Sequence, residues 1–209
     1  MRKTIVGVAT LCLVLASGAS AQETARVSVS PESKLWVDGT SSLHGWTCRT
    51  QSLDATIELD AKAAAQLTTA APSALRRVQV KVPVKSLKCG HGGMDNNLYK
   101  ALNADAAPEI SYIMASFEPA LGEANEAFGL KTVGSLTIAG TERRITMDVS
   151  ATRLADGSIK TTGVVPIKMT EFGVKPPTAM FGRIKTGDEV KVNFELIVGA
   201  KAIAAATKE

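Results

Sequence analysis

The chain has 209 residues, of which 45% are hydrophobic and 21% charged, and its formal net charge is +4 at neutral pH. This mild positive charge, with lysines and acidic residues interspersed, gives no reason to expect binding to nucleic acid. The length fits one domain, and no internal repeat or linker divides it.

The first 21 residues have the pattern of an export signal. Arg2 and Lys3 precede an uncharged apolar run, and Ala19-Ser20-Ala21 forms a small-residue cleavage motif. The alternative is an uncleaved membrane anchor, but the run is short for a bilayer span. No later stretch is long and apolar enough to be a transmembrane helix. We therefore expect cleavage near Ala21 and a location in the periplasm or outside the cell. Cleavage removes two positive charges and leaves 188 residues with a net charge of +2, as one domain over 22–209.

Period-two alternation of apolar and polar residues dominates the rest of the chain. Such alternation is typical of half-buried antiparallel strands. The clearest cases are Leu53–Leu59, Val78–Val84, Ile145–Ala151 and Val190–Val198, and further strands are predicted over Arg26–Val29, Lys34–Asp38, Ile110–Phe117, Gly134–Ile138 and Ile159–Met169. Pro166 suggests an edge or a bulge in the last of these.

Turn and helix signals separate these strands. Turns are predicted at Ala139–Glu142, Ala155–Ser158 and Thr186–Asp188. Short helices are predicted over Asp60–Leu67 and Met94–Asn103, and the tail 199–209 is expected to fray. Six to eight antiparallel strands with little helix predict an all-β fold. The residues alone leave open a sandwich or an up-and-down barrel.

Two cysteines, Cys48 and Cys89, remain after the signal. An even number of cysteines in an exported protein favours a disulfide between them. The alternative is a metal or redox site that also uses His44 and His91, although their spacing differs from that of common zinc sites. No cofactor is expected.

Catalytic motifs are not evident, so we expect no enzyme: the sequence has no phosphate loop, nucleophile elbow or metalloprotease helix. Two apolar features suggest a ligand instead. Trp36 and Trp46 either line a pocket or belong to the core or rim. The segment Glu171–Gly182 is apolar for a loop, so Phe172–Phe181 either covers a cavity as a lid or plugs the barrel.

Several segments in order resemble the YceI-like, polyisoprenoid-binding family. These are Leu35–Trp46, Met94–Leu102, Pro108–Tyr112, Gly134–Thr141, Phe172–Pro177 and Ile184–Phe194. The resemblance covers roughly residues 27–198, and the cysteine pair with its flanking histidines departs from the family pattern. It implies an antiparallel, up-and-down, lipocalin-like β-barrel of about eight strands with one or two short helices.

The resemblance also implies a function: holding an isoprenoid-type lipid or a quinone tail in the barrel, for transport, storage or a stress response. The protein would contact the membrane only transiently, for lipid exchange. The oligomeric state is open, and a dimer is one alternative. Apolar residues are expected to line the cavity, namely Phe117, Leu136, Ile138, Met147, Val149, Ile167, Met169, Phe172, Met180, Phe181 and Phe194. A structural or interaction domain with a solid core remains the third hypothesis, after the metal or redox protein.

Overall fold

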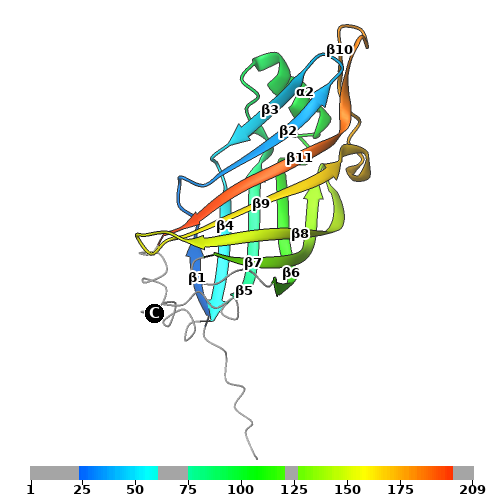
Figure 1. Ribbon diagram of the computed structural model, residues 1–209. Helices are drawn as coiled ribbons and strands as arrows, with labels where there is room; N and C mark the ends of the chain where they lie inside the picture. The colour runs from blue at the N-terminus through cyan, green and yellow to red at the C-terminus, as the bar shows by residue number, and fades with distance from the viewer. Residues whose placement is uncertain (1–23, 61–74, 121–126, 200–209) are drawn as a thin grey trace, which may run out of the picture.

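A computed structural model describes residues 24–60, 75–120 and 127–199 (Figure 1). The predicted signal peptide, residues 61–67 of the first predicted helix and the tail beyond residue 199 lie outside these residues. Asp60, the first residue of that predicted helix, is the last residue of a strand.

The described residues form eleven strands, one α-helix and two 3₁₀ helices. In chain order the elements are β1 (Thr24–Ser28), β2 (Lys34–Ser41), β3 (Gly45–Thr50), β4 (Asp54–Asp60), β5 (Leu75–Pro83), η2 (Val84–Ser86), α2 (Gly92–Ala101), β6 (Glu109–Ala120), β7 (Ala127–Ile138), β8 (Thr141–Arg153), β9 (Ile159–Lys168), η3 (Met169–Phe172), β10 (Thr178–Ala179) and β11 (Ile184–Val198). The all-β prediction is confirmed. The strand segments predicted from the sequence correspond to β1, β2, β4 to β9 and β11, whereas β3 and β10 were not predicted.

The strands form one antiparallel sheet in the order β1-β4-β5-β6-β7-β8-β9-β11-β2-β3, with β10 added to β11. From β4 to β9 each strand pairs with its neighbour in sequence, as in an up-and-down meander. The sheet curls into a half-barrel (Figure 1), and β1 and β3 are the two ends of its order. In the part of the chain that the structure describes, no strand ladder joins β3 to β1 or β4.

The predicted alternation corresponds to the two faces of this sheet. In β8, for example, Val149 and Ala151 are buried, whereas Asp148 and Ser150 are exposed. Pro166 lies in β9 beyond Gly163, the last residue of β9 that pairs with β8. The sheet has a local edge there, which suits a residue without an N–H group.

The turn predicted at Thr186–Asp188 is wrong, because these residues lie inside β11. The pairing of β11 with β2 shifts between Thr186 and Val190. The turn-forming residues therefore produce an irregularity within a long strand. Both Asp188 carboxylate oxygens accept hydrogen bonds from Thr170. The other two predicted turns are present: Ala139 and Gly140 connect β7 to β8, and Asp156 and Gly157 lie between β8 and β9.

The predicted helix at Met94–Asn103 is α2, and it begins two residues earlier than expected. His91 caps its N-terminus, and the His91 Nδ1 atom accepts a hydrogen bond from the Gly93 N–H at 3.2 Å. Leu98 and Leu102 pack against the core from this helix. Figure 1 shows α2 and β10 at one end of the half-barrel, called the α2 end below, and β1 at the other.

Candidate functional site: an apolar cavity in the half-barrel

The inner face of the curled sheet surrounds a cavity of about 300 Å³. Its wall includes residues of every strand from β1 to β9, of β11, of α2 and of η3. Almost all are aliphatic, aromatic or methionine side chains; Thr132 and Thr161 are the hydroxyl-bearing aliphatic residues among them. A cavity with such a wall suits an apolar ligand.

The alternating strands explain why the wall is apolar. Residues directly opposite each other on neighbouring strands project to the same face. Val149 in β8 lies opposite Leu130 in β7 and Gly163 in β9, and Val192 in β11 lies opposite Val37 in β2. Leu130, Val149, Val37 and Val192 all line the cavity.

Two glycines opposite aromatic residues help to keep the interior open. Gly39 in β2 pairs with Trp46 in β3, and Gly163 in β9 pairs with Phe194 in β11. A Cβ atom on Gly39 would lie 2.2 Å from Trp46 Cζ2, and one on Gly163 would lie 2.4 Å from Phe194 Cζ. The aromatic rings therefore occupy the space that a side chain would need, and they lie against the strands instead of filling the centre.

Tyr112 of β6 forms a similar contact with Gly134 of β7. A Cβ atom on Gly134 would lie 2.5 Å from both Tyr112 Cε2 and the Ile113 carbonyl oxygen. The Tyr112 hydroxyl donates to Thr132 Oγ1 at 3.3 Å, and Thr132 donates to the Met147 carbonyl oxygen at 3.4 Å. Burial in the apolar wall raises the pKa of Tyr112 above its ordinary value, and the hydrogen bond with Thr132 partly opposes this. The hydroxyl is thus neutral and paired within the wall.

The α2 end of the cavity is closely packed. Val84, Leu87 and Phe172 are nearly inaccessible, at 0%, 1% and 2% exposure, and Val174 is also buried. Thr170 of η3 donates to Asp188 through its backbone N–H at 2.9 Å and through its hydroxyl at 2.6 Å. These two hydrogen bonds lower the pKa of Asp188, so the ionised carboxylate holds η3 and its Phe172 against β11.

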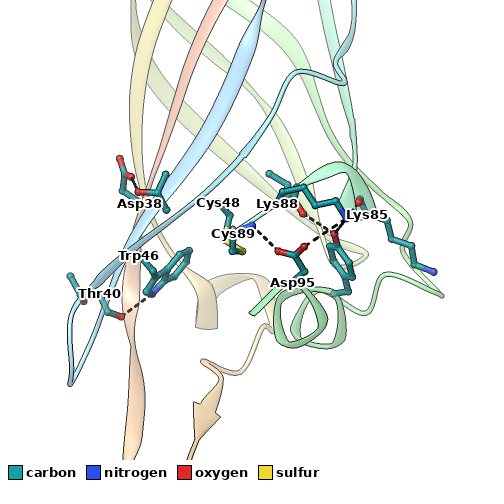
Figure 2. Close-up of a disulfide and its surroundings, with 11 residues drawn as sticks. Asp38, Thr40, Trp46, Cys48, Lys85, Lys88, Cys89 and Asp95 are labelled. Carbon is teal, nitrogen blue, oxygen red and sulfur yellow. Dashed lines mark hydrogen bonds and ion pairs between the residues drawn. A yellow bond between two sulfur atoms is a disulfide. The ribbon is translucent and has the colours of Figure 1, made fainter. Parts of the chain in front are cut away.

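The predicted disulfide joins Cys48 of β3 to Cys89, between η2 and α2 (Figure 2). Beside it, Arg49 and Lys88 exchange two backbone hydrogen bonds of 2.8 and 2.9 Å. Figure 2 also shows the Asp95 carboxylate accepting from the Cys89 N–H at 2.7 Å. The disulfide therefore connects the end strand β3 to the segment after β5, where the sheet has no ladder.

The disulfide also bears on the alternative metal site, because a bonded cysteine pair offers no thiolate. His44 Nδ1 lies 2.6 Å from the Gly45 carbonyl oxygen, and His91 is the cap of α2. Among the described residues, no group of three or more His, Cys, Asp or Glu side chains could hold a metal ion.

Eight of the eleven residues predicted to line a cavity do line it. They are Leu136, Ile138, Met147, Val149, Ile167, Met169, Phe172 and Phe194. Whether they contact a ligand stays a prediction.

The other three, Phe117, Met180 and Phe181, are not among the residues that line the cavity. Phe117 is half-buried and, beyond a shift in the β6–β7 register between Met114 and Ser116, pairs with the lining residue Thr132, but it is not itself part of the wall. Met180 and Phe181 occupy the turn between β10 and β11 and are exposed. The predicted lid thus covers the cavity only with its first part, Phe172 and Val174.

Several lining residues were not predicted. Trp46 and Tyr112 line the cavity, and Leu98 and Leu102 line it from α2. For Trp46 the sequence left cavity and core open, whereas Trp36 is not a lining residue because its neighbours Leu35 and Val37 take the inner positions of β2. The helical spacing of Leu98 and Leu102 was the signal for α2, but sequence does not place that helix at the end of a half-barrel.

An antiparallel half-barrel around an apolar cavity defines a lipocalin-like protein. The family model of the YceI-like domain matches residues 22–198, and the chain therefore belongs to the YceI-like family. No curated protein matches the chain.

Solved structures have the same fold at low sequence identity. BcnA of Burkholderia cenocepacia has a TM-score of 0.64 at 20% identity, over 81% of this chain and 98% of its own. A polyisoprenoid-binding domain from Saccharophagus degradans gives 0.60 at 16% identity, over 84% and 98% of the two chains. The YceI protein of Campylobacter jejuni gives 0.53 at 22% identity, over 72% and 82%.

Proposed function

We propose that this protein binds an isoprenoid-type lipid, a polyisoprenoid or the tail of a quinone, in its cavity and catalyses no reaction. The observation that carries the proposal is the cavity itself, because its wall of inward-facing strand residues is almost wholly apolar. Membership of the YceI-like family and the fold shared with a polyisoprenoid-binding domain support the choice of ligand.

The physical chemistry of the wall suits a methyl-branched chain. Each buried methylene contributes about 0.8 kcal/mol to the gross transfer free energy, so a few isoprene units outweigh much of the cost of association. Tyr112 and Thr132 satisfy each other, so an apolar chain beside them leaves no polar group unpaired. We propose that the eight lining residues Leu136, Ile138, Met147, Val149, Ile167, Met169, Phe172 and Phe194 contact the lipid.

We further propose that the protein acts in the periplasm or outside the cell, where it carries or stores the lipid and meets membranes only transiently. The signal-like sequence before Gln22 and the Cys48–Cys89 disulfide support this location, because disulfides persist in oxidising compartments. In the described part of the chain, no helix has the length and apolar character needed to cross a membrane.

Solvent extraction and mass spectrometry of the purified protein test the proposal. We expect an isoprenoid lipid in the wild type and much less in Met147→Trp. Met147 is a half-buried residue of the cavity wall, so an indole at this position would fill the cavity. Ser150→Trp places the same ring on the exposed face of the same strand and should retain the lipid. A wild type without isoprenoid, or equal lipid in a folded Met147→Trp variant, would contradict the proposal.

A further inference from the structure

Two turns meet at the α2 end of the half-barrel. One connects β2 to β3 and contains Leu43; the other connects β10 to β11 and contains Met180 and Phe181. The Ser42 N–H donates to the Lys185 carbonyl oxygen at 2.9 Å, and the Lys185 N–H donates to Ser42 Oγ at 3.1 Å. Figure 1 shows β10 projecting at this end, beside the turn between β2 and β3.

Three large apolar side chains on these turns face solvent, and together they form what we call the tip patch. Leu43 is 67% exposed, Met180 66% and Phe181 110%. Elsewhere in the described residues, the exposed large hydrophobic residues are Ile113 and Val164, which lie on strands. Among the described residues, three of the five exposed large hydrophobic side chains thus lie on these two turns.

The backbone at the tip patch gives a second observation. Met180 and Phe181 have φ angles of +52° and +54°, and the Gly182 N–H donates to the Ala179 carbonyl oxygen at 3.1 Å. Gly182 follows at φ +85°, so three successive residues of this four-residue loop are left-handed, a conformation that costs about 1–2 kcal/mol for each residue other than glycine or asparagine. Folding gains nothing from a methionine and a phenylalanine that are both exposed and in this conformation. Contact with something outside the chain is the physical reason that fits them.

The charges around the tip patch indicate what that contact is. Lys175, Arg183 and Lys185 are exposed and form no ion pair with any described residue. The sequence has no acidic residue between Glu171 and Asp188, and none between Asp38 and Asp54. Exposed apolar side chains flanked along the chain by cations without ion-pair partners match a bilayer with anionic headgroups, which takes apolar groups at its interface and attracts lysine and arginine.

We propose that the tip patch docks this protein on anionic lipid bilayers. Leu43, Met180 and Phe181 enter the headgroup region, and Lys175, Arg183 and Lys185 contact lipid phosphates. The segment between β9 and β11, which carries Met180 and Phe181, also holds Phe172 and Val174 of the cavity wall, so docking brings the α2 end of the cavity to the membrane. The purpose of docking, lipid exchange, rests on the proposed function, but the docking does not.

Flotation of the purified protein with vesicles tests the proposal. We expect binding to vesicles of phosphatidylglycerol and phosphatidylethanolamine, weaker binding to phosphatidylcholine vesicles, and a loss of binding at high salt. Met180→Asn combined with Phe181→Gly should weaken binding by roughly tenfold or more, because it removes two apolar side chains from the interface. Asparagine and glycine tolerate positive φ angles better than methionine and phenylalanine, so the unfolding midpoint of this variant should equal or exceed that of the wild type.

Matched variants separate the patch from general surface effects. Val164→Ser removes an apolar side chain that is 55% exposed in β9 and should leave flotation unchanged. Arg183→Gln with Lys185→Gln should weaken binding to anionic vesicles, whereas Lys131→Gln with Arg144→Gln, which removes the same charge from β7 and β8, should not. Equal flotation of the wild type and the Asn-Gly variant would overturn the docking, as would equal binding to both kinds of vesicle.

Lipid extraction from the same preparations keeps the two proposals apart. A protein that contains isoprenoid lipid but does not float with vesicles overturns the docking alone. A protein that floats through its tip patch but contains no isoprenoid overturns the cavity proposal and supports the docking.

Discussion

Gly163 illustrates how a single residue shapes the cavity. Glycine weakens a strand, because it has no side chain to pack and a low strand propensity. Here the missing side chain leaves room for the ring of Phe194. We expect Gly163→Ala to push that ring into the cavity and to destabilise the fold by about 1–3 kcal/mol, as overpacking does. Urea unfolding followed by circular dichroism measures the change.

Gly45→Ala is the matched control for this substitution. Gly45 also lies in a strand, but a Cβ atom there would meet only the Gly39 carbonyl oxygen at 3.6 Å, an ordinary contact. Its urea midpoint should stay close to that of the wild type. Equal urea midpoints for Gly163→Ala and Gly45→Ala would contradict this prediction. They would show that the Phe194 ring does not depend on the space that the missing Gly163 side chain leaves.

Sequence predicted individual residues where alternation was regular. Met147 and Val149 follow from the period of β8 and do line the cavity. Phe117 does not, although the register shift before it, which alternation in the sequence does not reveal, pairs it with the lining residue Thr132. Met180 and Phe181 were misplaced for a different reason: their hydrophobicity suggests burial, and only the backbone of the turn shows that they point into solvent.

At the level of elements, local patterns predicted strands better than they predicted strand order. The pairing of β7 with β8 and of β8 with β9 follows from neighbouring strands joined by short turns, which a sequence displays. The placement of β11 between β9 and β2 depends on pairs such as Phe194 with Leu35, which are far apart in the chain. The bulge at Gly187 is equally nonlocal, since a Cβ atom there would lie 2.5 Å from Thr40 Oγ1.

The disulfide has a specific role at this level, because β3 is an end strand with β2 as its only ladder partner among the described elements. We expect the double substitution Cys48→Ala with Cys89→Ala to reduce the free energy of unfolding by about 4 kcal/mol in the chain-entropy model, given the separation of 41 residues. Denaturant unfolding without a reducing agent measures this loss.

Reduction of the wild type supplies the control for the cysteine variant. Dithiothreitol should lower the midpoint of the wild type toward that of the double variant and should leave the variant itself unchanged. A variant as stable as the oxidised wild type would show that the Arg49–Lys88 backbone bonds hold β3 in place without the disulfide.

For the whole molecule, a hollow interior has a cost that a ligand offsets. The half-barrel places its largest cluster of buried residues at the α2 end and a smaller one, Val27, Leu59 and Val198, near the β1 end, with the cavity lined by members of both. A wall around an empty cavity forfeits dispersion contacts, and a bound apolar chain restores them. Stability and ligand occupancy should therefore be coupled in this protein.

We expect removal of bound lipid, by reversed-phase extraction and refolding, to lower the melting temperature. A ligand present at about one hundred times its dissociation constant stabilises the native state by about 2.7 kcal/mol, which in a domain of this size corresponds to a shift of roughly 5–10 °C. Adding back an isoprenoid alcohol should restore the melting temperature in calorimetry.

The Met147→Trp variant should show little of this shift, because its indole already occupies part of the cavity, whereas Ser150→Trp should show all of it. If added isoprenoid changes the melting temperature of neither the wild type nor Ser150→Trp, the lipid does not bind in the cavity.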